Sequence, residues 1–210
     1  MKKILLTALL SCVTVGVFAQ GVVQFRTFYA SSTPPVNAQV HLGDMAGPLL
    51  DSGNTLWRAA LIGGPTTGTA ANVAANVVGN LSMMYQPTTT TLTWVNFRAA
   101  PNAGYVSVTN PPRAVPGVDW GGQAMVQMVA WQGNYDTWAA AFAAWQAGTP
   151  DVLIGASNPL TLTLPASAQS TTLTYLTGLN SFAIVPVPEP TTFALAGLGA
   201  AALLIFRRRS

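Results

Sequence analysis

The stretch from residue 20 to residue 185, called the body below, contains no lysine, no glutamate and no cysteine. Charged residues make up only 7% of the whole chain, against roughly 25% in an ordinary soluble domain. The body therefore has neither thiols for a disulfide framework nor the charged faces of a coiled coil or a typical cytosolic enzyme. We expect it to fold by packing apolar and uncharged polar side chains alone.

The charges of the body form no basic cluster. Four arginines and five aspartates give it a net charge of −1, and the other basic residues lie at the two ends of the chain. The charged residues of the body are Arg26, Arg58, Arg98, Arg113, Asp44, Asp51, Asp119, Asp136 and Asp151. Binding to phosphate backbones needs clustered lysine and arginine, so we expect no nucleic-acid partner.

Residues 1–19 have the three parts of a secretory signal peptide. Two lysines form a positive start, residues 4–18 are largely apolar, and the small Ala19 ends the segment. We predict that signal peptidase cleaves between Ala19 and Gln20; an uncleaved N-terminal membrane anchor is the alternative. The single cysteine, Cys12, lies inside this segment, so the exported body would carry no thiol.

The last domain, residues 186–210, has three parts in a fixed order. They are a proline-rich motif at 187–190 with Pro188, Glu189 and Pro190, an apolar segment at 191–206, and a tail at 207–210 with Arg207, Arg208 and Arg209. The sixteen residues of the apolar segment predict a transmembrane helix of about 24 Å. Snorkelling arginines can make up the difference from the ~30 Å hydrocarbon core. The arginines place the body outside the cytoplasm. The prolines keep the motif extended, as a processing enzyme requires.

This end resembles the PEP-CTERM sorting signal. The resemblance implies recognition of Pro188, Glu189 and Pro190 by exosortase, a membrane-embedded, cysteine transpeptidase-like protease of Gram-negative bacteria. It further implies export across the inner membrane, transient anchoring by the C-terminal helix, and then transfer to the cell surface, the outer envelope or the exopolysaccharide matrix. A plain C-terminal membrane anchor is the alternative.

The body, as one domain at residues 20–185, is expected to be mainly β, an antiparallel β-sandwich with one short helix. Runs of β-branched and aromatic residues, separated by Gly, Pro and Asn, predict the strands. These lie at 22–29, 39–42, 56–62, 90–97, 104–109, 123–131, 160–164, 171–176 and 182–185. An alanine-rich stretch at 134–147 predicts the helix, with Asn134 or Asp136 as N-cap and Gly148 as C-cap. Trp138, Phe142 and Trp145 then form one apolar stripe, expected in the core.

The body also resembles a group of secreted, β-rich PEP-CTERM proteins of Verrucomicrobia-like bacteria. The matching stretches are residues 20–25, 38–42 and 127–131, the last followed by Tyr135 and a short helical segment. The group has no assigned biochemical activity, so the resemblance implies an architecture and no site.

Reactive side chains are scarce in the body, and we predict no catalysis, no metal and no cofactor. The lone His41 is expected to be a surface or half-buried strand residue. A serine triad would need His41 as its base, and the sequence has no Gly-x-Ser-x-Gly elbow to supply the nucleophile. One histidine without cysteine disfavours zinc, and the aspartates lack calcium-loop spacing. The remaining enzyme hypothesis is a glycosidase that pairs Asp119 with Asp136.

The six tryptophans offer an alternative, because exposed indole rings bind sugars. Trp120 lies in a turn-like stretch beside Asp119, whose carboxylate can accept hydrogen bonds from sugar hydroxyls; most of the other indoles should be core. We therefore expect an exported protein, sorted by an exosortase-type system, with a structural or interaction role. A carbohydrate-binding module for exopolysaccharide is the alternative.

Overall fold

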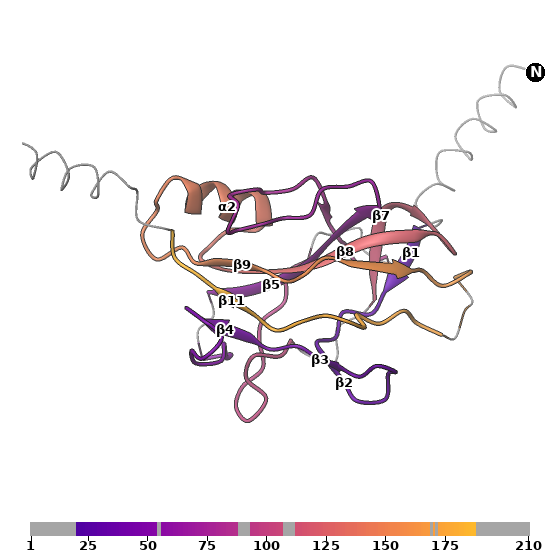
Figure 1. Ribbon diagram of the computed structural model, residues 1–210, viewed down its shortest axis with the longest axis horizontal. Helices are drawn as coiled ribbons and strands as arrows, with labels where there is room; N and C mark the ends of the chain where they lie inside the picture. Colours follow the sequence, from indigo (N-terminus) through magenta and orange to yellow (C-terminus); the bar gives the residue numbers. More distant parts are fainter. Residues whose placement is uncertain are drawn as a thin grey trace, which may run out of the picture.

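The computed structural model describes residues 20–53, 56–87, 93–106, 112–168, 170 and 172–187. These residues form a mainly β structure with one helix among them, α2 (Figure 1). The first six strands are β1 (Gln20–Val23), β2 (Phe28–Tyr29), β3 (Val36–Asn37), β4 (Val40–Leu42), β5 (Trp57–Pro65) and β6 (Ser82–Met83). The remaining elements are β7 (Arg113–Asp119), β8 (Gln123–Gln132), α2 (Trp138–Gln146), β9 (Ile154–Ala156), β10 (Leu160–Thr163) and β11 (Phe182–Ile184).

A five-stranded antiparallel sheet lies at the centre. Its strand order is β10-β8-β5-β6. β9 and β10 pair with the same edge of β8, β10 with residues 123–126 and β9 with residues 129–131. β5 and β8 pair along their whole length, from Trp57 opposite Gln132 to Pro65 opposite Ala124. Apart from the buried Arg58 and Gln127, the interior residues of both strands are apolar, which is the pattern of strands buried on two faces.

Each face of this sheet carries its own hydrophobic core. Alternate residues of β5 and β8 point to opposite faces, so Leu61 and Met128 enter one core and Ile62 and Val129 the other. The first core, here the large cluster, includes Val23, Phe25, Leu50, Leu61, Met128 and Ile184. The second, here the helix-side cluster, includes Ala60, Ile62, Val129, Trp131, Trp138, Phe142, Trp145 and Ile154.

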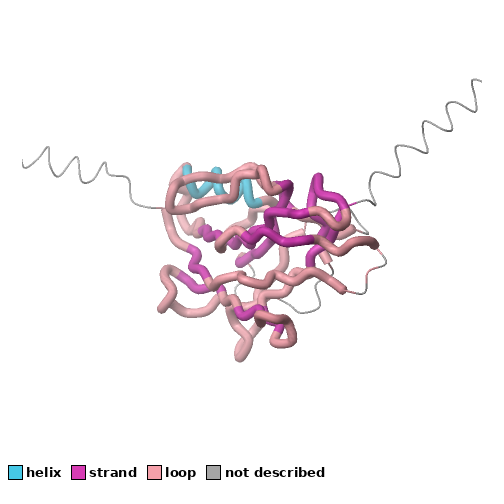
Figure 2. Tube along the Cα trace, turned by 45° about the vertical axis from the view of Figure 1, so that its right-hand side comes forward, coloured by secondary structure: helices cyan, strands magenta, loops and turns pink. Residues whose placement is uncertain are grey.

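Strands outside the central sheet form only two-stranded pairs. β1 pairs with β7 and β2 with β3, both antiparallel, while β11 runs parallel to β4. Loops connect these strand pairs and make up much of the protein outside the central sheet (Figure 2). The prediction of a mainly β body with one helix is confirmed, but the layer opposite the central sheet is a set of short pairs rather than a second continuous antiparallel sheet.

The predicted helix is present, but it starts later than the sequence indicated. Thr137, in extended conformation, is the N-cap, and its hydroxyl accepts a hydrogen bond from the Ala140 amide at 3.2 Å. The C-cap is Ala147 rather than the predicted Gly148, which follows it with a φ of +72° that suits glycine. The amide of Gly148 bonds the carbonyl of Trp145, and the amide of Thr149 bonds that of Ala144. Trp138, Phe142 and Trp145 are each at most 2% exposed, so the apolar stripe is core.

Several strand predictions differ from the structure. The predicted strand at 22–29 is interrupted between β1 and β2. Of the predicted strands at 90–97, 104–109 and 171–176, the described parts make only isolated bridges, at Val95, Phe97, Val106 and Thr174. β7 was not predicted, because Pro116 and Gly117 interrupt its pattern. The two-residue strands β3 and β6 and the short β9 were not predicted either.

Candidate functional site

Most of the residues that the sequence marks for processing lie outside the described part of the chain. This holds for Ala19, for Pro188, Glu189 and Pro190, for the predicted transmembrane helix at 191–206, and for Arg207, Arg208 and Arg209. Among the residues that the structure does describe, no helix has the length and apolar character to cross a membrane. The structure does describe the two residues that adjoin these segments, Gln20 and Val187.

Gln20 is the first residue of β1, opposite Asp119 of β7. Its side-chain oxygen accepts a hydrogen bond from the Tyr85 hydroxyl. The next residues, Gly21 to Val23, are buried. Gln20, the residue that the sequence predicts as the mature N-terminus, is thus held by a strand pairing and a side-chain hydrogen bond.

Residues 182–187, here called the strap, are the last described part of the chain. They comprise β11 and the three residues that follow it. The amide of Val185 donates to the carbonyl of Ile154 at 2.8 Å, and the amide of Ile154 donates back to Val185 at 3.1 Å. The carbonyl of Ile184 accepts from the Gly43 amide at 2.8 Å. Because Val187 packs against the helix-side cluster, the strap is fixed to the protein up to the residue before Pro188.

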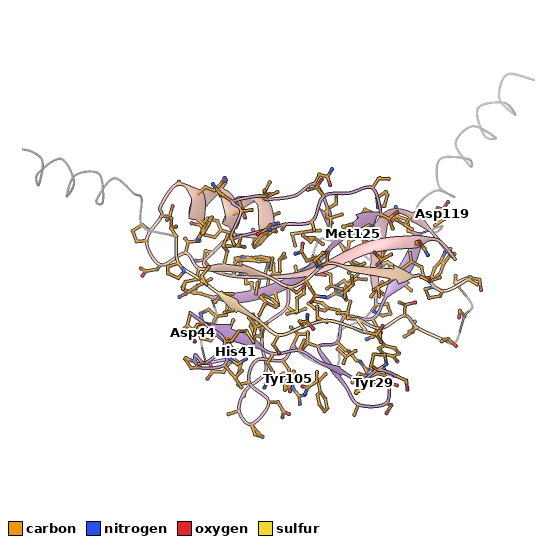
Figure 3. All side chains as sticks on the ribbon, in the orientation of Figure 1. Tyr29, His41, Asp44, Tyr105, Asp119 and Met125 are labelled. Atoms are coloured by element: carbon orange, nitrogen blue, oxygen red, sulfur yellow. The ribbon has the colours of Figure 1, made fainter. Side chains whose placement is uncertain are left out.

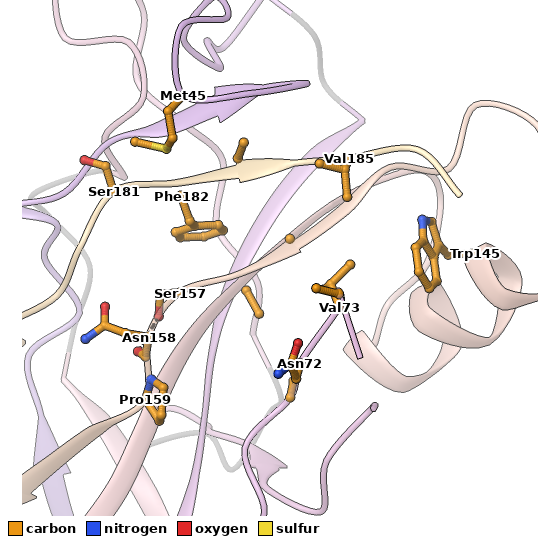
Figure 4. A pocket seen from close by; sticks show the side chains of 15 residues that line it. Met45, Asn72, Val73, Trp145, Ser157, Asn158, Pro159, Ser181, Phe182 and Val185 are labelled. Atoms are coloured by element: carbon orange, nitrogen blue, oxygen red, sulfur yellow. Dashed lines mark hydrogen bonds between the residues drawn. The ribbon is translucent and has the colours of Figure 1, made fainter. Parts of the chain in front are cut away.

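A groove of about 590 Å³ runs beside the strap (Figure 4). Val185, Val73 and Trp145 line one end, and Ser157, Asn158 and Ser181 line the other. Phe182 also lines the groove, on the side of Ser181 and Ser157. A smaller hollow of about 210 Å³ lies between Val187, Trp145, Gln146 and residues 73–76. The strap is therefore flanked by hollows lined mainly by apolar side chains.

The polar side chains of the groove are engaged in holding the fold. The Ser157 hydroxyl accepts from the Met128 amide at 3.1 Å and donates to the Asn158 carbonyl at 2.9 Å. The Asn158 amide group bonds Gly178 and Asn180. The Ser181 hydroxyl accepts from the amide of Gln39 at 2.9 Å. These groups serve strand connections rather than converging on a common point.

The two aspartates of the glycosidase hypothesis lie at opposite ends of β8. Asp119 precedes the strand by four residues and Asp136 follows it by four. Ten residues of strand span about 30 Å, whereas glycosidase carboxylates lie roughly 5–9.5 Å apart. Asp136 pairs instead with Arg58 at 3.0 Å. The pairing of Asp119 with Asp136 that the glycosidase hypothesis requires is therefore not found.

His41 is a half-buried residue of β4, as predicted, and its Nδ1 lies 3.1 Å from the carbonyl oxygen of Gly47. It lies with Asp44 at one end of the molecule, far from Asp119 (Figure 3). The Asp44 carboxylate accepts from the Ala46 amide at 2.8 Å. Within the described ranges, no three His, Cys, Asp or Glu side chains gather as they would around a metal ion.

The tryptophans divide into two groups. Trp131, Trp138 and Trp145 are buried in the helix-side cluster, while Trp57, Trp94 and Trp120 are half-buried. Trp120 occupies the β7–β8 turn next to the exposed Asp119, as the sequence indicated. The turn is closed by a hydrogen bond from the Gly122 amide to the Asp119 carbonyl at 3.1 Å.

The sequence did not reveal an aromatic surface around β2. Phe28 is 43% exposed and its ring centroid lies 5.3 Å from that of Tyr105. The rings of Tyr29 and Tyr175 stack with centroids 4.2 Å apart, and a side-chain hydrogen bond between the two phenols, together with burial, raises the pKa of Tyr175. The partners come from distant parts of the chain, so only tertiary structure could show the cluster.

Two arginines are buried, which the sequence also did not indicate. Arg113 is 1% exposed, near the ring of Phe25, and burial lowers its pKa to about 10. Arg58 is 8% exposed and lies over the ring of Trp94, 4.0 Å from its centroid. Both belong to the structural interior rather than to an open anion site.

Comparison with known proteins identifies one segment. Residues 186–209 match the PEP-CTERM protein-sorting motif. The motif marks an exported protein with a C-terminal, membrane-associated sorting signal, and it implies processing by exosortase. No curated protein and no solved structure matches the chain significantly. The resemblance of the body to verrucomicrobial proteins therefore stays a prediction.

Proposed function

We propose that this protein is exported after signal peptidase cleaves between Ala19 and Gln20, and that exosortase then removes its anchor and delivers the body to the cell surface or the exopolysaccharide matrix. The observation that carries the proposal is the sorting motif at residues 186–209. In processing, the peptide bond near the motif breaks, and water or an amine joins the new carbonyl end while the leaving nitrogen takes a proton.

In this proposal the body has a structural or interaction role without catalysis. The separation of Asp119 from Asp136 counts against the one enzyme that the sequence suggested. The polar groups of the groove bond to the fold itself. The mature protein would then lie at the cell surface or within the exopolysaccharide matrix.

A carbohydrate-binding module is the second candidate, because Trp120 is half-buried in a turn beside the exposed Asp119. The two candidates differ in one measurement. Saturable quenching of tryptophan fluorescence by exopolysaccharide from the host favours the module, and its absence favours the structural role.

The processing is tested by intact mass spectrometry of the protein from its own host, with Glu189→Gln as the variant. We expect the wild-type protein to start at Gln20 and to end near residues 188–190, and the variant to keep Arg207–Arg209 and remain in the membrane. Asp151→Asn makes the same carboxylate-to-amide change at an exposed residue of the body and should be processed normally. A wild-type protein that retains its arginines at the inner membrane would contradict the proposal.

A further inference from the structure

The strap is bound to the protein by two sets of contacts. Val185 exchanges both of its backbone hydrogen bonds with Ile154 of β9, at 2.8 and 3.1 Å. Ile184 is fully buried, and Val187 packs against the helix-side cluster beside Trp145. Figure 4 shows Val185 on the same side of the groove as Val73 and Trp145. The backbone that immediately precedes Pro188, the first residue of the Pro-Glu-Pro sequence, is thus part of the fold.

The chain leaves little length between the strap and the membrane-associated segment. Pro188, Glu189 and Pro190 alone separate Val187 from Thr191, where the apolar segment begins. Four residue steps of fully extended chain reach at most about 14 Å. A protease that acts on the motif must fit its cleft into this interval, close to both the membrane and the end of the protein that carries α2.

Peptides that enter a binding cleft do so in extended form, with their backbone groups available to the enzyme. For a bond cut near residues 188–190, the residues on its N-terminal side are those of the strap, and the backbone groups of Val185 are already bonded to Ile154. Cleavage of a segment that is closed in the native state depends on the population of its open form.

Building on the proposed function, we propose that the strap controls the access of the processing protease to the sorting motif. Exosortase-type cleavage then proceeds through a local opening in which residues 185–187 leave Ile154 and the helix-side cluster. The contacts of Val185 and Val187 slow the release of the body from its anchor, and a longer or looser connection speeds it.

The test follows the rate at which the pulse-labelled full-length precursor becomes the processed form in host cells. One variant carries six Gly-Ser residues between Val187 and Pro188, which gives the protease free chain without changing the fold. A second, Val187→Asn, weakens the packing of the strap. We expect both to be processed about three- to tenfold faster than the wild type, because local openings cost little compared with global unfolding.

Two matched controls accompany these variants. The same six residues are inserted between Ala30 and Ser31, both exposed, and Val77→Asn repeats the substitution at an exposed valine outside the strap. Both controls should be processed at about the wild-type rate. The melting temperature of the purified insertion variant should equal that of the wild type, which separates a longer connection from general unfolding.

The outcomes distinguish this inference from the proposed function. Normal processing of the wild type, with no gain in rate for either strap variant, overturns the inference and leaves the proposed function standing. A wild type that is never processed overturns both. Faster processing of the two controls as well would show that the effect does not belong to the strap, and would also overturn the inference.

Discussion

The guanidinium of Arg58 lies inside the protein, with 10% of its side chain exposed. One Nη atom donates to the Tyr135 carbonyl at 2.5 Å and to the Asp136 carboxylate at 3.0 Å. The ring of Trp94 covers the guanidinium at 4.0 Å, while the carboxylate of Asp136 is 90% exposed. Because water screens an exposed partner, the carbonyl and the indole should stabilise this charge more than the carboxylate does.

We expect Arg58→Ala to lower the free energy of unfolding of residues 20–187 by about 2–4 kcal/mol, since it removes a buried charged hydrogen bond and a cation–π contact. Asp136→Asn should lower it by less than about 1 kcal/mol. Urea unfolding followed by tryptophan fluorescence measures both. Equal losses for the two variants would show that the ion pair, rather than the carbonyl and Trp94, holds the arginine.

At the scale of secondary-structure elements, β9 and β11 approach each other at Gly155. A Cβ placed on this glycine would lie 2.4 Å from the carbonyl oxygen of Ala183, a distance that requires the backbone to move. Gly155 is buried, so the movement would reach the strap, including the hydrogen bonds between Ile154 and Val185. The absence of a side chain at this position allows the strap to lie against β9.

Gly155→Ala should therefore cost about 1–3 kcal/mol of stability, as overpacking of an interior usually does, and should increase hydrogen exchange at the Val185 amide. Gly64→Ala is the control, because Gly64 is also a buried strand glycine, but its Cβ would meet Leu81 at an ordinary 3.5 Å. Differential scanning calorimetry and hydrogen exchange give the two readouts. Similar behaviour of both variants would contradict the close approach of the two strands.

The sequence predicted best those elements whose buried residues form a recognisable pattern within one short stretch of chain. The apolar runs of β5 and β8 are covered on both faces, and the stripe of Trp138, Phe142 and Trp145 repeats at helical spacing. The late start of α2 was missed, because Asn134, Asp136 and Thr137 are all acceptable caps and only the folded backbone selects among them. High strand propensity near Val95 gave isolated bridges, since a strand also needs a partner.

The candidate site was predictable only in part, for the same reason. The sorting motif is a linear pattern, so its three parts are visible in the sequence and the comparison finds them at residues 186–209. The strap depends on Ile154 and Trp145, which are more than thirty residues away from Val185 and Val187. No local pattern could show that the residues before Pro188 are held by the fold.

At the scale of the whole molecule, the two hydrophobic clusters share the strands that separate them. Ala59 and Leu61 face the large cluster, while Ala60 and Ile62 of the same strand face the helix-side cluster. Loss of either cluster would expose one face of β5 and β8 to water. We therefore expect residues 20–187 to unfold as one cooperative unit, although they contain two cores and no cysteine.

Two substitutions that remove a buried aromatic ring, one in each cluster, test this cooperativity. Phe25→Ala empties a site in the large cluster and Phe142→Ala one in the helix-side cluster, and each should cost about 3–5 kcal/mol. Phe28→Ala, at a ring that is 43% exposed, is the control and should cost about 1 kcal/mol or less. Each variant should show a single transition, coincident by far-ultraviolet circular dichroism and by tryptophan fluorescence. A Phe142→Ala protein whose fluorescence transition precedes loss of its β signal would mean that the helix-side layer unfolds separately and that the central sheet persists without it.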